Sequence, residues 1–366
     1  VLARSAERAA HDPAEKARVG QITSALLTWT VVIVVPLVVV IVAVAGPVAA
    51  LLNPSNPNAH CVRADMVATT GDMLRVFALQ ALFYGLSVVL YGLLQSYRRF
   101  AAPSIGPGIS SLVLIACYLA FEPLNKGHSL AQLPYSAELV LSAGTTLGIA
   151  ALVVVAIPPT IRLHLRFRPT LRFPHGVAGR VRGLALVGVA ELVAIDVASV
   201  VAIALANGRG QTGALVLYNY GSQVFNSIAA ILALSIVISA FPVMAAREGQ
   251  AFDRASAGST RAVLLMSWLG TAVIAAIAVP AAHVLAKQPD QVSQLIWAFL
   301  LFAPGVAGIA VIANLSRVMF VIKRLKIAAV ALAGSWVITI VADLVLVELA
   351  PARLVPAMLA LGTTIG

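Results

Sequence analysis

Two acidic residues, Glu191 and Asp196, lie inside the apolar stretch "LALVGVAELVAIDVASVVAIALA" and are the first candidates for chemistry in this sequence. A charged side chain within a lipid-spanning helix is costly and usually faces a cavity or a partner. Because five residues separate their positions, the two side chains lie about 140° apart around an α-helix and need not share a face. Two interpretations stay open: an ion-coupling site for a proton or a cation, or structural hydrogen bonds to a neighbouring helix.

Arginine and amide side chains form the second set of candidates. Arg98 and Arg99 lie between two long apolar runs, and Arg75 lies near the end of another. Arg75 could contact an anionic headgroup or snorkel to the interface. The pair Arg98 and Arg99 could anchor the topology of the two flanking spans. Asn219 and Gln223 could line a wet path or bond across helices. The same two alternatives apply to Gln80, Asn226 and Asn314.

Signatures of enzyme chemistry are missing from the sequence. It contains no HExxH pattern, no phosphate-binding glycine loop and no paired-cysteine metal spacing, and none of the 6 histidines pairs with another at i, i+4. We therefore expect no catalytic residue, no metal site and no cofactor. For Cys61 and Cys117 we favour two unpaired thiols over a disulfide.

The composition identifies the solvent of most of this chain as lipid. Hydrophobic residues make up 60% and charged residues 11%, and the mean hydropathy is +0.97. A soluble domain carries about 25% charged residues. The net charge of +11 would suggest nucleic acid in a soluble protein, but here the basic residues occupy short loops, where they set membrane orientation.

The apolar runs have the length of membrane-spanning helices. About 20 apolar residues cross a bilayer, and a helix satisfies its own backbone groups there. The sequence therefore predicts an all-α, polytopic membrane protein. The nine complete spans are expected at residues 25–52, 74–96, 101–121, 136–161, 183–206, 213–244, 262–286, 292–316 and 326–349, with the start of a tenth near 353.

Basic residues alternate between the loops that join these spans. Counted from the N-terminus, the odd gaps hold most of the 25 Lys and Arg residues. Since Lys and Arg mark cytoplasmic loops, we expect the odd gaps, beginning with segment 1–24, to face the cytoplasm. Segment 1–24 could form an interfacial amphipathic helix after Pro13. The basic loop 162–182 interleaves arginine with Leu and Phe, a pattern that suits anionic lipid headgroups.

The same topology places two further acidic residues, Asp343 and Glu348, toward the outer end of the span 326–349. We expect interfacial water to solvate both side chains.

Two stretches resemble a known family. "VLYGLLQSYRRFAAPSIGPGISSLVLI" (89–115) is similar to the junction of the fourth and fifth helices of the MurJ/MviN family. The matching positions are Gly92, Leu94, Arg99, Phe100, Ala102, Pro103 and Pro107. "LVLYNYGSQVFNSIAAILALSIVISAFPVMAARE" (215–248) resembles the family's eighth helix, in a form that looks like the actinobacterial branch. Segment 166–182 resembles the stretch that joins the family's two bundles.

The resemblance implies a two-lobed transporter fold of the multidrug/oligosaccharidyl-lipid/polysaccharide exporter superfamily. Residues 25–161 would form a partial N-lobe, 162–182 the connector and 183–366 an incomplete C-lobe, with family helices missing at both ends. Many relatives start the eighth helix with Asp-Arg, where this chain has Tyr220 and Gly221, so a central diphosphate-binding arginine would be missing.

The function that the resemblance implies is lipid II translocation from the inner to the outer leaflet of the bacterial cytoplasmic membrane. The Arg98–Arg99 region would serve as a cytoplasmic gate or headgroup contact. Expected partners are an undecaprenyl-diphosphate-linked glycan, membrane lipids and cell-wall synthesis proteins, with no nucleic acid. The alternatives are another polysaccharide-unit exporter or a cation-coupled drug exporter of the superfamily, and a non-transporting scaffold for cell-wall synthesis.

Overall fold

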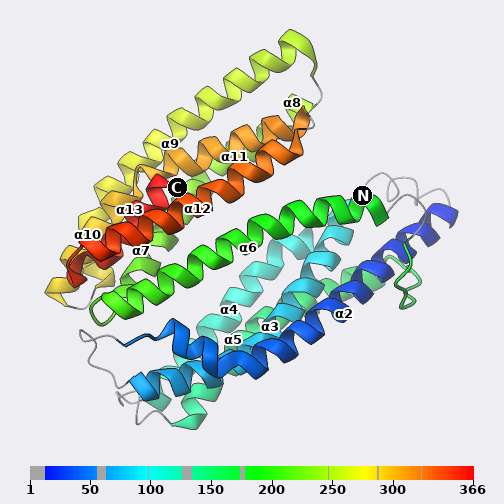
Figure 1. The fold of residues 1–366 in the computed structure, drawn as a ribbon. Coiled ribbons are helices and arrows are strands. Elements are labelled where there is room, and N and C mark those ends of the chain that lie inside the picture. The colour runs from blue at the N-terminus through cyan, green and yellow to red at the C-terminus, as the bar shows by residue number, and fades with distance from the viewer. Residues whose placement is uncertain are drawn as a thin grey trace. The chain divides into compact units, whose positions relative to one another are not determined.

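The computed structural model describes residues 13–55, 63–97, 99–125, 134–173, 178–245, 247–286, 288–322 and 324–366. In these ranges every regular element is a helix, and nine helices are long and apolar enough to cross a membrane (Figure 1). The predicted all-α, polytopic architecture is therefore confirmed. The helices are α2 (Pro13–Leu52), α3 (Arg63–Ser96), α4 (Ala101–Asn125), α5 (Tyr135–Ile161), α6 (Ala178–Arg209), α7 (Ala214–Ile228), η2 (Ala229–Leu234), α8 (Ser235–Ala245), α9 (Gly249–Leu285), α10 (Pro289–Phe302), α11 (Gly305–Val321), α12 (Leu325–Leu349), η3 (Ala352–Leu354) and α13 (Val355–Ile365).

Several helices begin well before the apolar spans that sequence predicts. α2 begins at Pro13 rather than near 25, α3 at Arg63 rather than 74, and α9 at Gly249 rather than 262. Hydropathy detects only the part of a helix that lies in lipid, whereas hydrogen bonding continues through the polar turns that precede it.

The chain divides into two compact units. The first comprises residues 1–51 and 61–183, and the second comprises 52–60 and 184–366. In the first unit α5 packs against both α3 and α4 (Figure 1). Small residues permit close helix approach there, because a Cβ on Gly144 would lie 2.4 Å from Cys117 Sγ. Cys61 lies outside the described residues, so the thiol prediction stays open.

Polar side chains also join the helices of the first unit. Gln80 on α3 donates to the hydroxyls of Thr145 and Thr146 on α5, over 3.4 and 3.2 Å. Tyr91 donates to the Leu152 carbonyl over 3.2 Å. Gln80 therefore forms hydrogen bonds between helices, which was one of the two interpretations of this residue from the sequence.

The second unit has an aromatic core built by α7, α9, α10 and α13. Phe302 stacks on Phe225 with ring centroids 5.2 Å apart, and Tyr218 tilts against Phe302 at 5.7 Å. A polar link joins α9 to α11: Ser259 donates to Asn314 Oδ1 over 2.7 Å, and Asn314 donates to Thr260 over 2.9 Å. Asn314 is thus a buried interhelical bridge.

Two predicted spans of the second unit have irregular backbones. The span predicted at 213–244 contains the π-helix Ala229–Leu234, and the Ser235 hydroxyl donates to the Ala230 carbonyl over 2.9 Å. The span predicted at 292–316 is divided at Pro304, which follows α10 and precedes α11. Proline lacks the N–H that would continue the helix ladder.

Candidate functional site

α7 has a packed face and a polar face. Leu217, Gly221 and Phe225 are buried in the second unit. Asn219 and Gln223 are exposed within this unit, as is Asn226 one turn further along. The positions i, i+4 and i+7 share one helix face, so three amides form a polar stripe on an otherwise apolar span. The structure thus brings the predicted residues Asn219 and Gln223 together, and their amides could hydrogen-bond a polar group.

The stripe lies one turn before the π-helix. Asn226 donates to the Ser222 carbonyl over 2.8 Å and to the Ser222 hydroxyl over 3.1 Å, which keeps its amide against α7. A π-helix replaces the regular i→i−4 ladder with wider turns and often occurs at functional sites. The polar stripe and a backbone irregularity therefore share one membrane span.

The packing around Gly221 leaves no room for a long side chain at that position. A Cβ built there would lie 3.0 Å from two ring atoms of Phe302. An arginine at 221 would have to displace this buried ring. Tyr220, the preceding residue, is exposed within the unit.

Asp343 on α12 is a buried carboxylate, and the expectation that water solvates it is wrong. We expected interfacial water around it, but its side chain is 1% exposed and packs against α13. Gly362 makes this possible, because a Cβ there would lie 1.9 Å from Asp343 Oδ1. Nearby, the Tyr218 and Thr363 hydroxyls are 3.4 Å apart.

Within the described part of the chain, Asp343 Oδ1 has no hydrogen-bond partner. A buried carboxylate in that state is either protonated or balanced by a cation. No group of three or more His, Cys, Asp or Glu that could hold a metal ion occurs among the described residues. Asp343 is therefore a candidate to exchange a proton or a cation, although the sequence shows it only as an acidic residue in an apolar run.

Glu348, the second acidic residue of α12, remains exposed. It forms an ion pair with Arg209, the last residue of α6. Solvation of this side chain at a helix end agrees with the expectation from sequence.

Of the two acidic candidates on α6, the structure describes the side chain of Asp196 alone. Asp196 is exposed on α6 within its unit, and the side chain of Glu191 lies outside what the structure describes. Their role in ion coupling stays a prediction.

The candidate arginines of the first unit have local partners. Arg75 pairs with Asp72, one turn earlier on α3. Arg99 donates to the Pro159 carbonyl at the end of α5 over 3.2 Å, where a cation stabilises the helix dipole. Arg98 lies outside the described residues. Headgroup binding or gating by these arginines stays a prediction.

Comparison with known proteins gives a family and a fold. A family model described as "Lipid II flippase MurJ" matches residues 5–366. The chain is similar to the solved structure "Lipid II flippase MurJ, inward closed conformation", with 13% identity, a TM-score of 0.72, and coverage of 100% of this chain and 75% of that one. No curated protein sequence matches the chain significantly.

A second solved structure is described as an inward-facing multidrug resistance MATE family transporter of the MOP superfamily. It shares 12% identity and a TM-score of 0.74, and the match covers 100% of this chain and 81% of that one. At this identity the two structures show the fold, which is that of a MurJ/MATE-like transporter.

Proposed function

Because the chain belongs to the lipid II flippase MurJ family, we propose that it moves lipid II from the inner to the outer leaflet of the bacterial cytoplasmic membrane by alternating access. The family match over residues 5–366 is the observation that carries this proposal. The physical task is severe, since moving a diphosphate and sugars through hydrocarbon strips them of water. A protein surface with polar groups at membrane depth removes that barrier.

In this proposal the amide stripe of α7 contacts the headgroup of the cargo. Asn219 and Gln223 offer both donors and acceptors, which suit sugar hydroxyls and the peptide of lipid II. Arg75, Arg98 and Arg99 would act on the diphosphate or at a gate. The reaction is transport, in which no covalent bond of the lipid changes. Cell-wall synthesis proteins would use the lipid after it has crossed.

Asp343 is a further candidate for ion coupling in this chain, beside Glu191 and Asp196. Asp343 is buried against α13, whereas Asp196 is exposed. The charged form of a buried carboxylate is tolerated only in a conformation where a proton or a monovalent cation compensates it. Binding or release of that ion can therefore shift the equilibrium between two conformations.

The direct test follows lipid II accessibility at the outer face of cells depleted of this protein. Depletion should stop translocation, and expression of the protein should restore it. Asn219→Leu with Gln223→Leu should restore it poorly, while Val216→Leu, at another exposed position of α7, should restore it fully. Normal translocation after depletion would remove the proposal.

Coupling is tested in the same cells with Asp343→Asn and Glu348→Gln. We expect Asp343→Asn to slow translocation and to abolish its dependence on the ion gradient. Glu348→Gln, which changes an exposed carboxylate on the same helix, should leave both unchanged. Equal gradient dependence in wild type and Asp343→Asn would reassign coupling to another residue.

A cation-coupled drug exporter rests on fold likeness alone, at 12% identity. Drug efflux from vesicles containing this protein would support that alternative.

If the protein is a non-transporting scaffold, translocation should stay normal with both α7 leucine substitutions.

A further inference from the structure

The segment after α5 is bound along the first half of α2. Arg168 donates its backbone N–H to Ser24 Oγ over 3.1 Å, and Thr170 donates its N–H to Thr28 Oγ1 over 3.2 Å. Trp29 Nε1 donates to the Leu171 carbonyl over 3.1 Å. We call residues 164–171 the connector strand, although no β-sheet is formed.

The spacing of these contacts explains the fit. Four residues of an α-helix rise about 6 Å, and two residues of extended chain cover about 6.6 Å. Ser24 and Thr28, four apart on α2, therefore meet Arg168 and Thr170, two apart on the connector strand. Gly20 continues this register one helical turn earlier, since a Cβ there would lie 3.1 Å from the Arg166 carbonyl. The positions of Gly20, Ser24 and Thr28 on α2 therefore match the spacing of Arg166, Arg168 and Thr170 on the connector strand.

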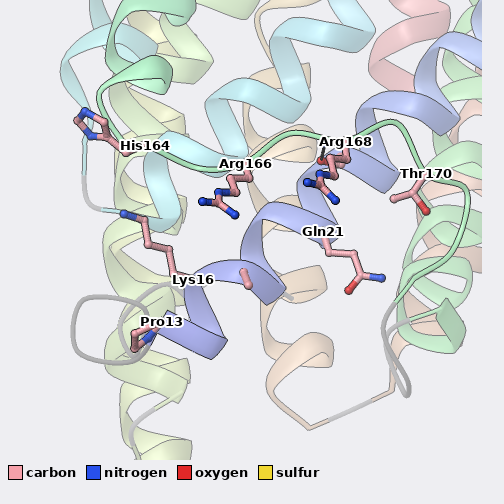
Figure 2. A pocket seen from close by; sticks show the side chains of 9 residues that line it. Pro13, Lys16, Gln21, His164, Arg166, Arg168 and Thr170 are labelled. Atoms are coloured by element: carbon pink, nitrogen blue, oxygen red, sulfur yellow. Dashed lines mark hydrogen bonds between the residues drawn. The ribbon is translucent and has the colours of Figure 1, made fainter.

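A cavity of about 710 Å³ lies between the connector strand and the start of α2. Figure 2 shows Arg166 and Arg168 extending from the connector strand on one side and Lys16 from α2 on the other. Among the described residues that line it there is no Asp or Glu, and none of these three cations forms an ion pair within the described chain. The lining residues are Pro13, Lys16, Ala17, Gln21, Ser24, His164, Arg166, Arg168 and Thr170.

Exposed side chains along α2 indicate that the cavity lies at the level of lipid headgroups. Trp29, 38% exposed, follows Ser24 by just over one turn, and Ile33, 59% exposed, follows one turn later. Tryptophan concentrates at the membrane interface, and exposed aliphatic side chains beyond it mark the hydrocarbon. On the connector strand itself, exposed Phe167 and Leu171 alternate with the arginines. Apolar and cationic groups are thus interleaved at one depth.

We propose that this cavity binds the phosphate group of an anionic phospholipid from the adjacent leaflet. Two guanidinium groups can each bind phosphate oxygens in pairs, and the Lys16 ammonium adds a point charge. Polar Gln21 and Thr170 offer further donors for the headgroup. The bound lipid would contact side chains of both the connector strand and α2, and would so hold the two segments together. This resident lipid is distinct from the transported cargo, so the inference goes beyond the proposed function.

The test uses the whole protein in nanodiscs of phosphatidylcholine with a minor fraction of phosphatidylglycerol, and counts retained lipids by native mass spectrometry. Wild type should retain phosphatidylglycerol selectively. The triple variant Lys16→Gln, Arg166→Gln, Arg168→Gln should bind it about a hundredfold more weakly, as expected for three lost interfacial charges. The matched control is Arg162→Gln with Arg172→Gln, which neutralises two exposed arginines flanking the strand and outside the cavity lining; it should bind nearly as wild type does.

Further measurements distinguish a lipid phosphate from free phosphate and identify variants that do not fold. Lys16→Arg keeps the charge and should keep the lipid, and a melting curve identifies any variant that fails to fold. Inorganic phosphate and glycerol phosphate, added at millimolar concentration, should not displace the lipid. Equal retention by wild type and the folded triple variant would overturn the proposal. So would displacement by inorganic phosphate, which would identify a site for free anions.

Discussion

At the scale of single residues, Gly362 is the position where one methyl group should matter most. A Cβ there would lie 1.9 Å from Asp343 Oδ1 and 3.2 Å from the Asp343 backbone nitrogen. We expect Gly362→Ala to lower the free energy of unfolding by about 1–3 kcal/mol, because the buried carboxylate must leave its place. Gly334→Ala, on α12 with nothing within 4 Å of the built Cβ, is the control and should be neutral or stabilising.

Thermal unfolding in one detergent compares these variants. If the clash is the cause, Asp343→Ala should recover most of the loss in the double variant with Gly362→Ala. Additive losses in that double variant would show that Gly362 acts through another neighbour.

Two tyrosines of the first unit should respond oppositely to removal of the hydroxyl. Tyr97 has a buried hydroxyl without a partner among the described residues, and burial raises the pKa of its phenol. Tyr91 donates to the Leu152 carbonyl over 3.2 Å. We expect Tyr97→Phe to be neutral or stabilising and Tyr91→Phe to destabilise by about 1 kcal/mol. Thermal melts of both variants test this, and a clear loss in Tyr97→Phe would mean that its hydroxyl has a partner.

At the scale of elements, the break at Pro304 leaves carbonyls that other helices satisfy. Thr271 on α9 donates to the Ala303 carbonyl over 2.8 Å, and Thr364 on α13 donates to the Leu301 carbonyl over 2.6 Å. We expect Thr364→Val to destabilise the protein by about 1–2 kcal/mol, since the Leu301 carbonyl would lose this donor. Thr271→Val should cost less, because the Ala303 carbonyl also accepts from the Val306 backbone N–H over 3.3 Å.

The control for this pair is Thr30→Val on α2. The Thr30 hydroxyl donates to the Leu26 carbonyl of its own helix over 2.9 Å, an acceptor that the helix ladder already uses. Its loss should cost little. If all three variants melt alike, the two hydroxyls do not cap the break.

Sequence predicts the elements of this molecule better than their contacts. Lipid requires long apolar helices, so hydropathy alone located the spans. Burial of Asp343, in contrast, depends on Gly362 of α13, and the Arg209–Glu348 pair joins residues 139 apart in sequence. Neither contact leaves a local pattern. The π-helix in residues 214–245 likewise has no signature in an apolar run, whereas the two amides on α7 were found because polar side chains are rare there.

At the scale of the whole molecule, the alternation of loop charge predicts which side of the membrane each loop faces. Thr170 belongs to an odd, arginine-rich gap, and Gln211 belongs to an even gap with few basic residues. In a background with Cys61→Ser and Cys117→Ser, we expect Thr170→Cys to react with a membrane-impermeant maleimide only after cells are opened. Gln211→Cys, exposed in its loop, should react in intact cells.

This result bears on both proposals, since orientation decides which leaflet supplies the lipid. With residues 162–173 in the cytoplasm, the cavity beside Lys16 meets the inner leaflet, where the negative surface potential of anionic lipids attracts basic segments. Labelling of Thr170→Cys in intact cells would reverse the topology and place the cavity in the outer leaflet, because loop charge fixes all spans together.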